Sequence, residues 1–163
     1  MAESFRIRPA VQADGGFLGD MVVEAANWRG GGARPRHEVI SSAEHSRYLT
    51  GWMRPGDTGF AAEDLREPVG AAWYRMLPRS EPGFGWVGTG VPELIIGVRP
   101  IWRAHGVGRA LLQRLCESAR AQGFARLSLS VERDNFAVTL YRSEGFAVTQ
   151  SGLGRDTMVK RLR

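Results

Sequence analysis

The sequence predicts an α/β protein with a mixed central sheet of about seven strands, flanked by about four helices. The composition is that of a globular protein, with 43% apolar and 24% charged residues in a chain of 163. Some segments alternate apolar and polar residues at the strand period, and others repeat apolar residues at the helical period. The segments follow one another in the order β-α-α-β-β-β-α-β-α-β-β. Because the chain shows no internal repeat and no break in composition, we expect one domain over residues 1–163.

The first half of the chain begins with a strand and continues with two helices. "FRIRP" (5–9) alternates and predicts the strand, and apolar residues at helical spacing between 18 and 25 predict the first helix. "WRGGGARPR" (28–36) is rich in glycine and arginine and predicts a loop. "SSAE" (41–44) has the pattern of a capping box, so we expect it to open a second helix that continues to about residue 52.

A hairpin and a long loop follow. "TGFAAED" (58–64) and "VGAAWYRML" (69–77) predict two strands, joined by a turn at "LREP" (65–68). Residues 78–92 contain four glycines and three prolines and predict a loop. Loops of this length are uncommon in compact domains unless they serve a function.

The second half alternates strands with helices and closes on a hairpin. "ELIIGV" (93–98) and "RLSLSV" (126–131) predict two strands, separated by a helix over about 106–122 that Gly123 ends. Asn135 is placed to cap a short helix. The remaining strands are predicted at "FAVTQ" (146–150) and "DTMVKRL" (156–162).

The net charge of +5 fits several kinds of partner. An anionic small ligand, a nucleic acid or an anionic membrane surface would each suit it. The arginines are scattered along the chain, which speaks against a nucleic-acid-binding domain. The N-terminus lacks an apolar signal core and no apolar run approaches ~18 residues, so we expect a cytoplasmic protein without a membrane span. The one cysteine, Cys116, can form no disulfide framework or cysteine metal site.

The stretch "RAHGVGRALL" (103–112) predicts an anion site at the start of a helix. Backbone N–H groups at a helix N-terminus lack intrahelical partners, and glycine lets an anion approach them closely. Arg103, His105 and Arg109 add positive charge at the same place. The stretch matches neither the P-loop pattern nor the complete dinucleotide fingerprint. A tight turn with solvated arginines is the alternative.

Two stretches together resemble the GNAT superfamily of N-acyltransferases. "ELIIGVRPIWRAHGVGRALLQRL" (93–115) is similar to the family's acyl-CoA-binding segment, whose signature [QR]-x-x-G-x-[GA] is matched by residues 103–108. "LSLSVERDNFAVTLYRSEGF" (127–146) resembles its next segment, a strand and an Asn followed by a helix with a Tyr and a terminal Gly-Phe. The two stand in the family's order and cover about 55 residues. Ala104 departs from the pattern, because many members have glycine there.

The resemblance implies that acetyl-CoA is the cosubstrate and that no metal takes part. The diphosphate of CoA would lie on the backbone N–H groups of Arg103, Ala104, His105, Gly106, Val107, Gly108 and Arg109. The pantetheine arm would pair with the backbone of Ile96, Gly97 and Val98, in a gap between two parallel strands, and Asn135 would face the same arm.

The resemblance also implies direct attack of a primary amine on the thioester. The N–H of Val98 would stabilise the oxyanion, and Tyr141 would be the general acid. A phenol is protonated at neutral pH and can donate to the leaving thiolate. The alternative is that Tyr141 only packs against the core. Glu93 is the first candidate for the base. The weaker candidates are Glu132, His37 and His45.

The acceptor pocket is predicted from aromatic residues in the variable first half of the chain. Trp28 and Tyr74 are the two that we expect to face it. The sequence thus predicts an acetyl-CoA-dependent N-acetyltransferase. The alternatives are a CoA-binding protein of the same fold without turnover and a basic nucleic-acid-binding domain. The identity of the amine and the presence of a homodimer stay open.

Overall fold

The structure is a computed structural model that describes residues 4–30, 34–65 and 67–163. Part of the predicted glycine-rich loop (31–33) and residue 66 of the predicted turn lie outside the described residues. None of the described helices is long and apolar enough to span a bilayer.

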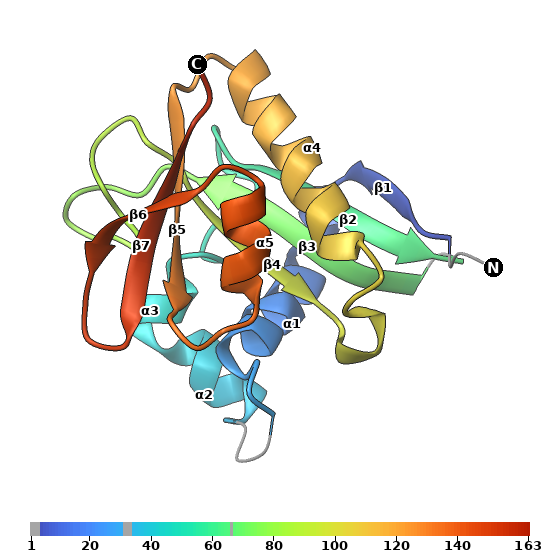
Figure 1. The fold of residues 1–163 in the computed structure, drawn as a ribbon. Helices are drawn as coiled ribbons and strands as arrows, with labels where there is room; N and C mark the ends of the chain where they lie inside the picture. The colour runs from blue at the N-terminus through green and yellow to red at the C-terminus, as the bar shows by residue number, and fades with distance from the viewer. Residues whose placement is uncertain (1–3, 31–33, 66) are drawn as a thin grey trace.

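A seven-stranded mixed sheet organises the fold, as predicted (Figure 1). Its order is β1-β2-β3-β4-β5-β7-β6, and neighbouring strands are antiparallel except for the parallel pair β4 and β5. The strands are β1 (Arg6–Pro9), β2 (Thr58–Asp64), β3 (Glu67–Arg75), β4 (Glu93–Val98), β5 (Arg126–Glu132), β6 (Ala147–Ser151) and β7 (Arg155–Arg161).

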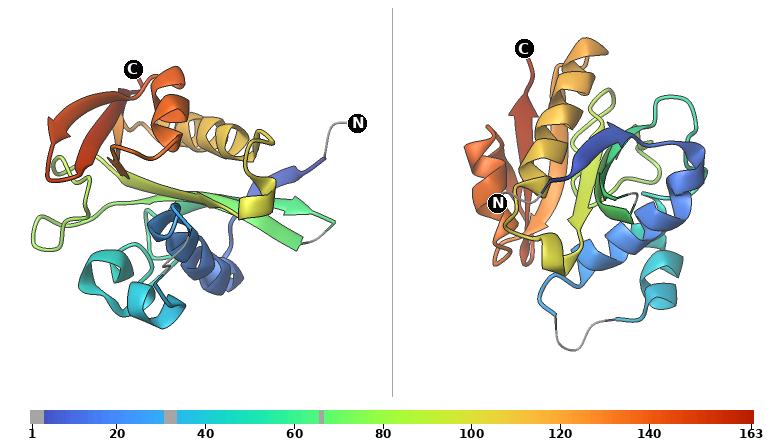
Figure 2. Two further views of the ribbon diagram at one scale, coloured as in Figure 1. Left: turned by 60° about the horizontal axis from the view of Figure 1, so that its bottom comes forward. Right: turned by 90° about the vertical axis from the view of Figure 1, so that its right-hand side faces the viewer.

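Helices cover both faces of the sheet. Figure 2 shows the N-terminal helices, in blue and cyan, on one face and the C-terminal helices, in orange, on the other. The helices are α1 (Gly15–Ala26), α2 (Arg36–Ser41), α3 (Ala43–Ser46), α4 (Val107–Ala121) and α5 (Ala137–Ser143), with single 3-10 turns at Gln12–Asp14 and Pro100–Trp102.

The second predicted helix is instead two short ones. Ser42 adopts an extended conformation between α2 and α3, which ends the first of them. It is Ser42, not Ser41, whose hydroxyl caps α3 by accepting the N–H of His45. Residues 47–53 continue as turns, so Tyr48 and Trp52 reach the core from turns and not from a helix face.

Alternation along the strands divides the core in two. Ala72, Tyr74 and Leu94 point to the α4 face, where they join the apolar side of α4 and buried Cys116. Ala71, Trp73 and Ile95 point to the α1 face. Helix α1 crosses β4 so closely that a Cβ on Gly97 would lie 2.5 Å from the backbone oxygen of Met21.

The parallel strands β4 and β5 separate almost at once. They share one bridge, Glu93↔Ser128, with the N–H of Ser128 3.1 Å from the oxygen of Pro92. On the other side of β4, the N–H of Arg99 donates to the oxygen of Val69 at 2.8 Å. Because antiparallel pairing alternates, the backbone groups of Ile96 and Val98 face away from β3 and into the gap beside β5.

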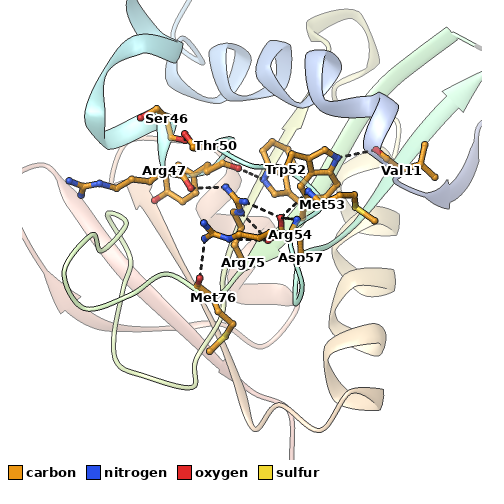
Figure 3. A network of polar contacts seen from close by, with 12 residues as sticks. Val11, Ser46, Arg47, Thr50, Trp52, Met53, Arg54, Asp57, Arg75 and Met76 are labelled. Atoms are coloured by element: carbon orange, nitrogen blue, oxygen red, sulfur yellow. Dashed lines mark hydrogen bonds and ion pairs between the residues drawn. The ribbon is translucent and has the colours of Figure 1, made fainter.

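A buried ion pair fixes the turn segment that precedes β2 (Figure 3). The side chain of Arg75 is fully buried and donates to both carboxyl oxygens of Asp57, at 3.0 and 2.9 Å. It also donates to the backbone oxygen of Arg47 at 2.9 Å, and Asp57 accepts the N–H groups of Met53 and Arg54. Residues 47–57 are thereby held against β3 although they form turns and not a regular helix.

We expect Arg75→Leu to lower the free energy of unfolding by about 3–5 kcal/mol, because Asp57 would be left charged and buried without its partner. The control is Arg6→Leu, which removes an exposed arginine 3.9 Å from Glu63 while Arg8 still pairs with that carboxylate, and it should cost no more than about 0.5 kcal/mol. Urea unfolding of both variants checks this. Equal, small losses would show that the buried pair does not hold the segment.

Candidate active site

A cavity of about 500 Å³ lies where β4 and β5 diverge. Its lining comes from both strands and from both faces of the sheet, so the gap between the strands connects the two layers. The α4 face contributes the residues around the start of α4 and α5, and the α1 face contributes Trp28, His45, Tyr48, Phe84, Glu93, Ser130, Glu132 and Arg155.

The turn before α4 gives the cavity an anion-binding end. The N-cap of α4 is Gly106, with a φ of 83°, and the first intrahelical bond runs from the N–H of Ala110 to the oxygen of Gly106. The N–H groups of the three residues between them have no partner within the helix. Ala104 also has a left-handed φ, 64°, at a cost of roughly 1–2 kcal/mol for a residue with a Cβ.

Most of the predicted cofactor residues line the cavity. They are Ile96, Gly97, Val98, Arg103, Ala104, Gly106, Gly108, Arg109 and Asn135. Val107 and His105 do not: the side chain of Val107 is buried in the α4 core, and the ring of His105 packs edge-on to Trp102. These two residues could contribute backbone N–H groups only.

The predicted phosphate-binding arginines already have acidic partners. Arg103 lies 3.7 Å from Glu24, and Arg109 pairs with Glu144. Asn135 is likewise engaged, because its side-chain oxygen accepts the N–H of Ala137 at the start of α5. The backbone N–H groups at the α4 N-terminus are therefore the principal donors for an anion at this end.

Tyr141 reaches the cavity from α5. The residue is 7% exposed, and its ring packs edge-on to Phe146. Burial raises the pKa of Tyr141 above its ordinary value, so the phenol carries its proton at neutral pH. This position and protonation state suit a proton donor.

Glu93 and Tyr48 form a buried hydrogen-bonded pair on the α1 face. Oε2 of Glu93 accepts the Tyr48 hydroxyl and, at 3.0 Å, the N–H of Gly85, while the Tyr48 oxygen accepts the N–H of Phe84. Burial raises the pKa of Glu93 to about 7. The hydrogen bonds from Tyr48 and Gly85 and the charge of Arg155 act in the opposite direction, because each favours the ionised carboxylate. A carboxyl group with this pKa can exchange a proton near neutral pH.

The long loop that precedes β4 closes directly over this pair. A Cβ on Gly83 would lie 2.2 Å from Oε1 of Glu93, so only glycine fits there. Oε1 is buried and has no hydrogen-bond partner among the described residues. The loop at 78–92, predicted to be functional from its length, thus forms part of the site.

The other candidate bases differ in how they are held. Glu132 accepts the indole N–H of Trp28 at 2.7 Å, so Trp28 lines the cavity with its polar edge occupied. His45 lies 2.8 Å from the Ser42 hydroxyl, and burial lowers its pKa, which keeps the ring neutral. His37 is exposed on α2 and does not line the cavity.

Comparison with known proteins identifies the family. The acetyltransferase (GNAT) family matches residues 14–146. The chain belongs to this family. Among solved structures, the ribosomal-protein-alanine N-acetyltransferase from Brucella melitensis is 26% identical with a TM-score of 0.68, covering 96% of this chain and 99% of that one. The PaiA N-acetyltransferase from Thermoplasma acidophilum, in complex with coenzyme A, has a TM-score of 0.72 at 17% identity, covering 97% and 99%.

Curated relatives are longer than this chain. The mycothiol acetyltransferase of Beutenbergia cavernae is 30% identical, over 82% of this chain and 52% of that protein. The mycothiol acetyltransferase of Corynebacterium glutamicum is 32% identical, over 60% of this chain and 37% of its own length. The chain therefore spans about half or less of the curated relatives that it matches.

Tyr74 does not lie where the sequence analysis expected an acceptor residue. It is fully buried on the α4 face, edge-on to Phe124 at 5.8 Å, and does not line the cavity. The alternation along β3 is the reason, since it directs Trp73 to the α1 face and Tyr74 to the opposite one. We do not retain Tyr74 as a substrate residue of this GNAT protein.

Tyr48, Ser130 and Arg155 are among the lining residues that the sequence analysis missed. Tyr48 stood in a segment predicted to be helical. Arg155 stood in a predicted turn, and it reaches the site because the strand register pairs it with Glu132. No local motif marks these positions. Among the described residues, no cluster of three or more His, Cys, Asp or Glu side chains could hold a metal ion.

The raised pKa of Glu93 predicts a pH-dependent contribution to stability. Its folded pKa, about 7, lies above the ordinary 4.5, so the contribution is complete below about pH 4.5 and is lost as the pH rises through 7. The lowered pKa of His45 makes its own contribution to stability increase with pH, so the wild-type profile alone does not isolate the effect of Glu93. Thermal unfolding of Glu93→Gln and wild type from pH 4.5 to 8 isolates it by comparison.

We expect the variant to gain stability relative to wild type as the pH rises, by up to roughly 3 kcal/mol. The amide keeps an acceptor for Tyr48 and Gly85 but never becomes charged. Parallel profiles for the two proteins would show that folding does not raise the pKa of Glu93.

Proposed function

We propose that this GNAT protein transfers an acetyl group from acetyl-CoA to a primary amine, by direct attack of the amine on the thioester. The observation that carries the proposal is the cavity between β4 and β5, which joins an anion-binding helix N-terminus to a buried carboxyl group. The acetyltransferase names of its relatives support the same reaction.

The residues of this cavity fit acetyl-CoA. The cosubstrate would supply the acetyl group as a thioester. The N–H groups at the start of α4 would hold its diphosphate. The backbone groups of Ile96 and Val98, which face the gap, would pair with its amide-containing arm.

Proton transfers are assigned to residues on either side of the gap. An amine must be neutral to attack, yet an alkylammonium has a pKa near ~10.4, so a base is required. Glu93, with Tyr48 beside it, would accept this proton directly or through water. Val98 N–H would stabilise the carbonyl oxygen, and Tyr141 would protonate the leaving thiolate. We place this reaction in the cytoplasm.

Acetyl-CoA binding is the first test, with Gly106→Asp as the disabling variant. At one hundred times its dissociation constant, acetyl-CoA should stabilise the wild-type protein by ~2.7 kcal/mol. The aspartate places a negative charge beside the diphosphate, so the shift should be lost. A Cβ at Gly106 meets no atom within 4 Å, and aspartate tolerates the left-handed φ of 83° better than most residues, so the variant should fold.

The control is Gly106→Asn, which has the same size and a similar tolerance of left-handed backbone but no charge. It should keep most of the ligand-induced shift in a thermal unfolding assay. Wild-type protein that is not stabilised by millimolar acetyl-CoA would refute the proposed function.

Tyr141→Phe tests whether the protein turns over or only binds. We expect turnover to fall by ~10²–10⁴-fold with little change in acetyl-CoA affinity, because the ring stays and only the proton donor is removed. Tyr74→Phe is the control, since it removes a buried hydroxyl on the α4 face without touching the cavity. Thiol release with any accepted amine gives the rates. Unchanged turnover in Tyr141→Phe would reduce Tyr141 to a packing residue.

A further inference from the structure

Arg155 projects from the start of β7 into the acceptor side of the cavity. Its Nε donates to the Ser130 hydroxyl at 3.0 Å, and its guanidinium lies over the ring of Phe84, 4.3 Å from the centroid. The side chain is thus held from two sides, by a polar anchor on β5 and by an aromatic face from the 78–92 loop. It is partly buried and not a mobile surface arginine.

The guanidinium lacks an acidic partner. Among the described residues no carboxylate lies within ion-pair distance of Arg155, whereas the two arginines at the other end of the cavity pair with Glu24 and Glu144. The two acids that line the same face of the cavity have other hydrogen-bond partners: Glu93 accepts Tyr48, and Glu132 accepts Trp28. A partly buried cation that makes no direct ion pair is stabilised when a bound ligand supplies one.

The charge of Arg155 acts on the reacting end of the acceptor site. It lowers the pKa values of Glu93, Tyr48 and His45, so it lies within electrostatic reach of all three. These three residues and Arg155 line the cavity on the α1 face, away from the anion-binding helix N-terminus. A group bound by Arg155 would therefore belong to the acceptor and not to the diphosphate of the cosubstrate.

We propose that Arg155 binds an oxyanion group of the acceptor, so that the substrate is an amine that also carries a carboxylate or a phosphate. This inference rests on the proposed function and specifies its acceptor class. Only one of the five N–H donors of Arg155 is used within the described structure, and the planar guanidinium fits a carboxylate or phosphate with two parallel bonds. The amine of the same molecule would then lie toward Glu93.

The test uses matched acceptor pairs with saturating acetyl-CoA. The carboxylate arm compares the amino acids that carry a primary amine with their carboxamides, and the phosphate arm compares phosphoethanolamine with ethanolamine. Thiol release gives kcat/KM. Calorimetric binding of the N-acetylated members in the presence of CoA is a second readout that needs no turnover. We expect wild type to prefer the anionic member of at least one pair by about 10- to 100-fold.

Arg155→Met should remove this preference while keeping acetyl-CoA binding, because the cosubstrate end lies across the gap. Arg155→Lys should keep part of the preference, because lysine retains the positive charge but lacks the planar guanidinium that makes two parallel hydrogen bonds. The control is Arg126→Met, an exposed arginine at the far end of β5 that does not line the cavity. It should leave the preference unchanged. Whichever arm shows the preference identifies the oxyanion as carboxylate or phosphate.

Two results would overturn the inference alone: acetyl-CoA binds but no anionic member is preferred in either readout, or Arg155→Met keeps the preference. Failure of wild type to bind acetyl-CoA would instead refute the proposed function itself. The two failures are distinguishable because cosubstrate binding is measured without an acceptor.

Discussion

β4 and β5 run parallel, yet the sheet joins them through the single bridge Glu93↔Ser128. Beyond it, the strands part while β3 on one side and β7 on the other remain fully paired with them. The backbone groups of Ile96 and Val98 are then left without a strand to pair with. A buried backbone N–H or C=O without a hydrogen-bond partner is unfavourable, so these groups favour a ligand that supplies one. A cleft lined by backbone donors and acceptors follows from this divergence, and different side chains line it on the two faces of the sheet.

The bridge also determines where the buried carboxyl group stands. Glu93 is opposite Arg75 in the register of β3 and β4, so the two side chains share the α1 face. Arg75 is nevertheless committed to Asp57 and to the backbone oxygen of Arg47. Glu93 is left with a neutral partner, Tyr48, and burial can hold its pKa near 7. The ion pair in Figure 3 thus supports the site twice, by placing residues 47–57 and by leaving Glu93 without an ion-pair partner.

The order of elements and the anion-binding end were predictable because their signals are local. Alternation marked β1 and β5, and the glycines at 106 and 108 marked the start of α4. The acceptor side was less predictable, because Tyr48 and Arg155 meet only through tertiary turns and strand register. Tyr74 was misplaced because the sequence shows alternation along β3 without showing which face is which. The break between α2 and α3 was missed because it depends on the extended backbone of Ser42 alone. A capping pattern does not show which of the two neighbouring serines is the cap.

The claim that the diverging strands form the acetyl-CoA site is tested most directly by amide hydrogen exchange at Ile96 and Val98. Both N–H groups should exchange measurably in the protein alone and become strongly protected when acetyl-CoA saturates it. Amides of the edge strand β6, which is exposed throughout its length, should not change. Exchange at Ile96 and Val98 that is the same with and without saturating acetyl-CoA would contradict the claim, because a ligand bound in this cleft must pair with the strand that lines it.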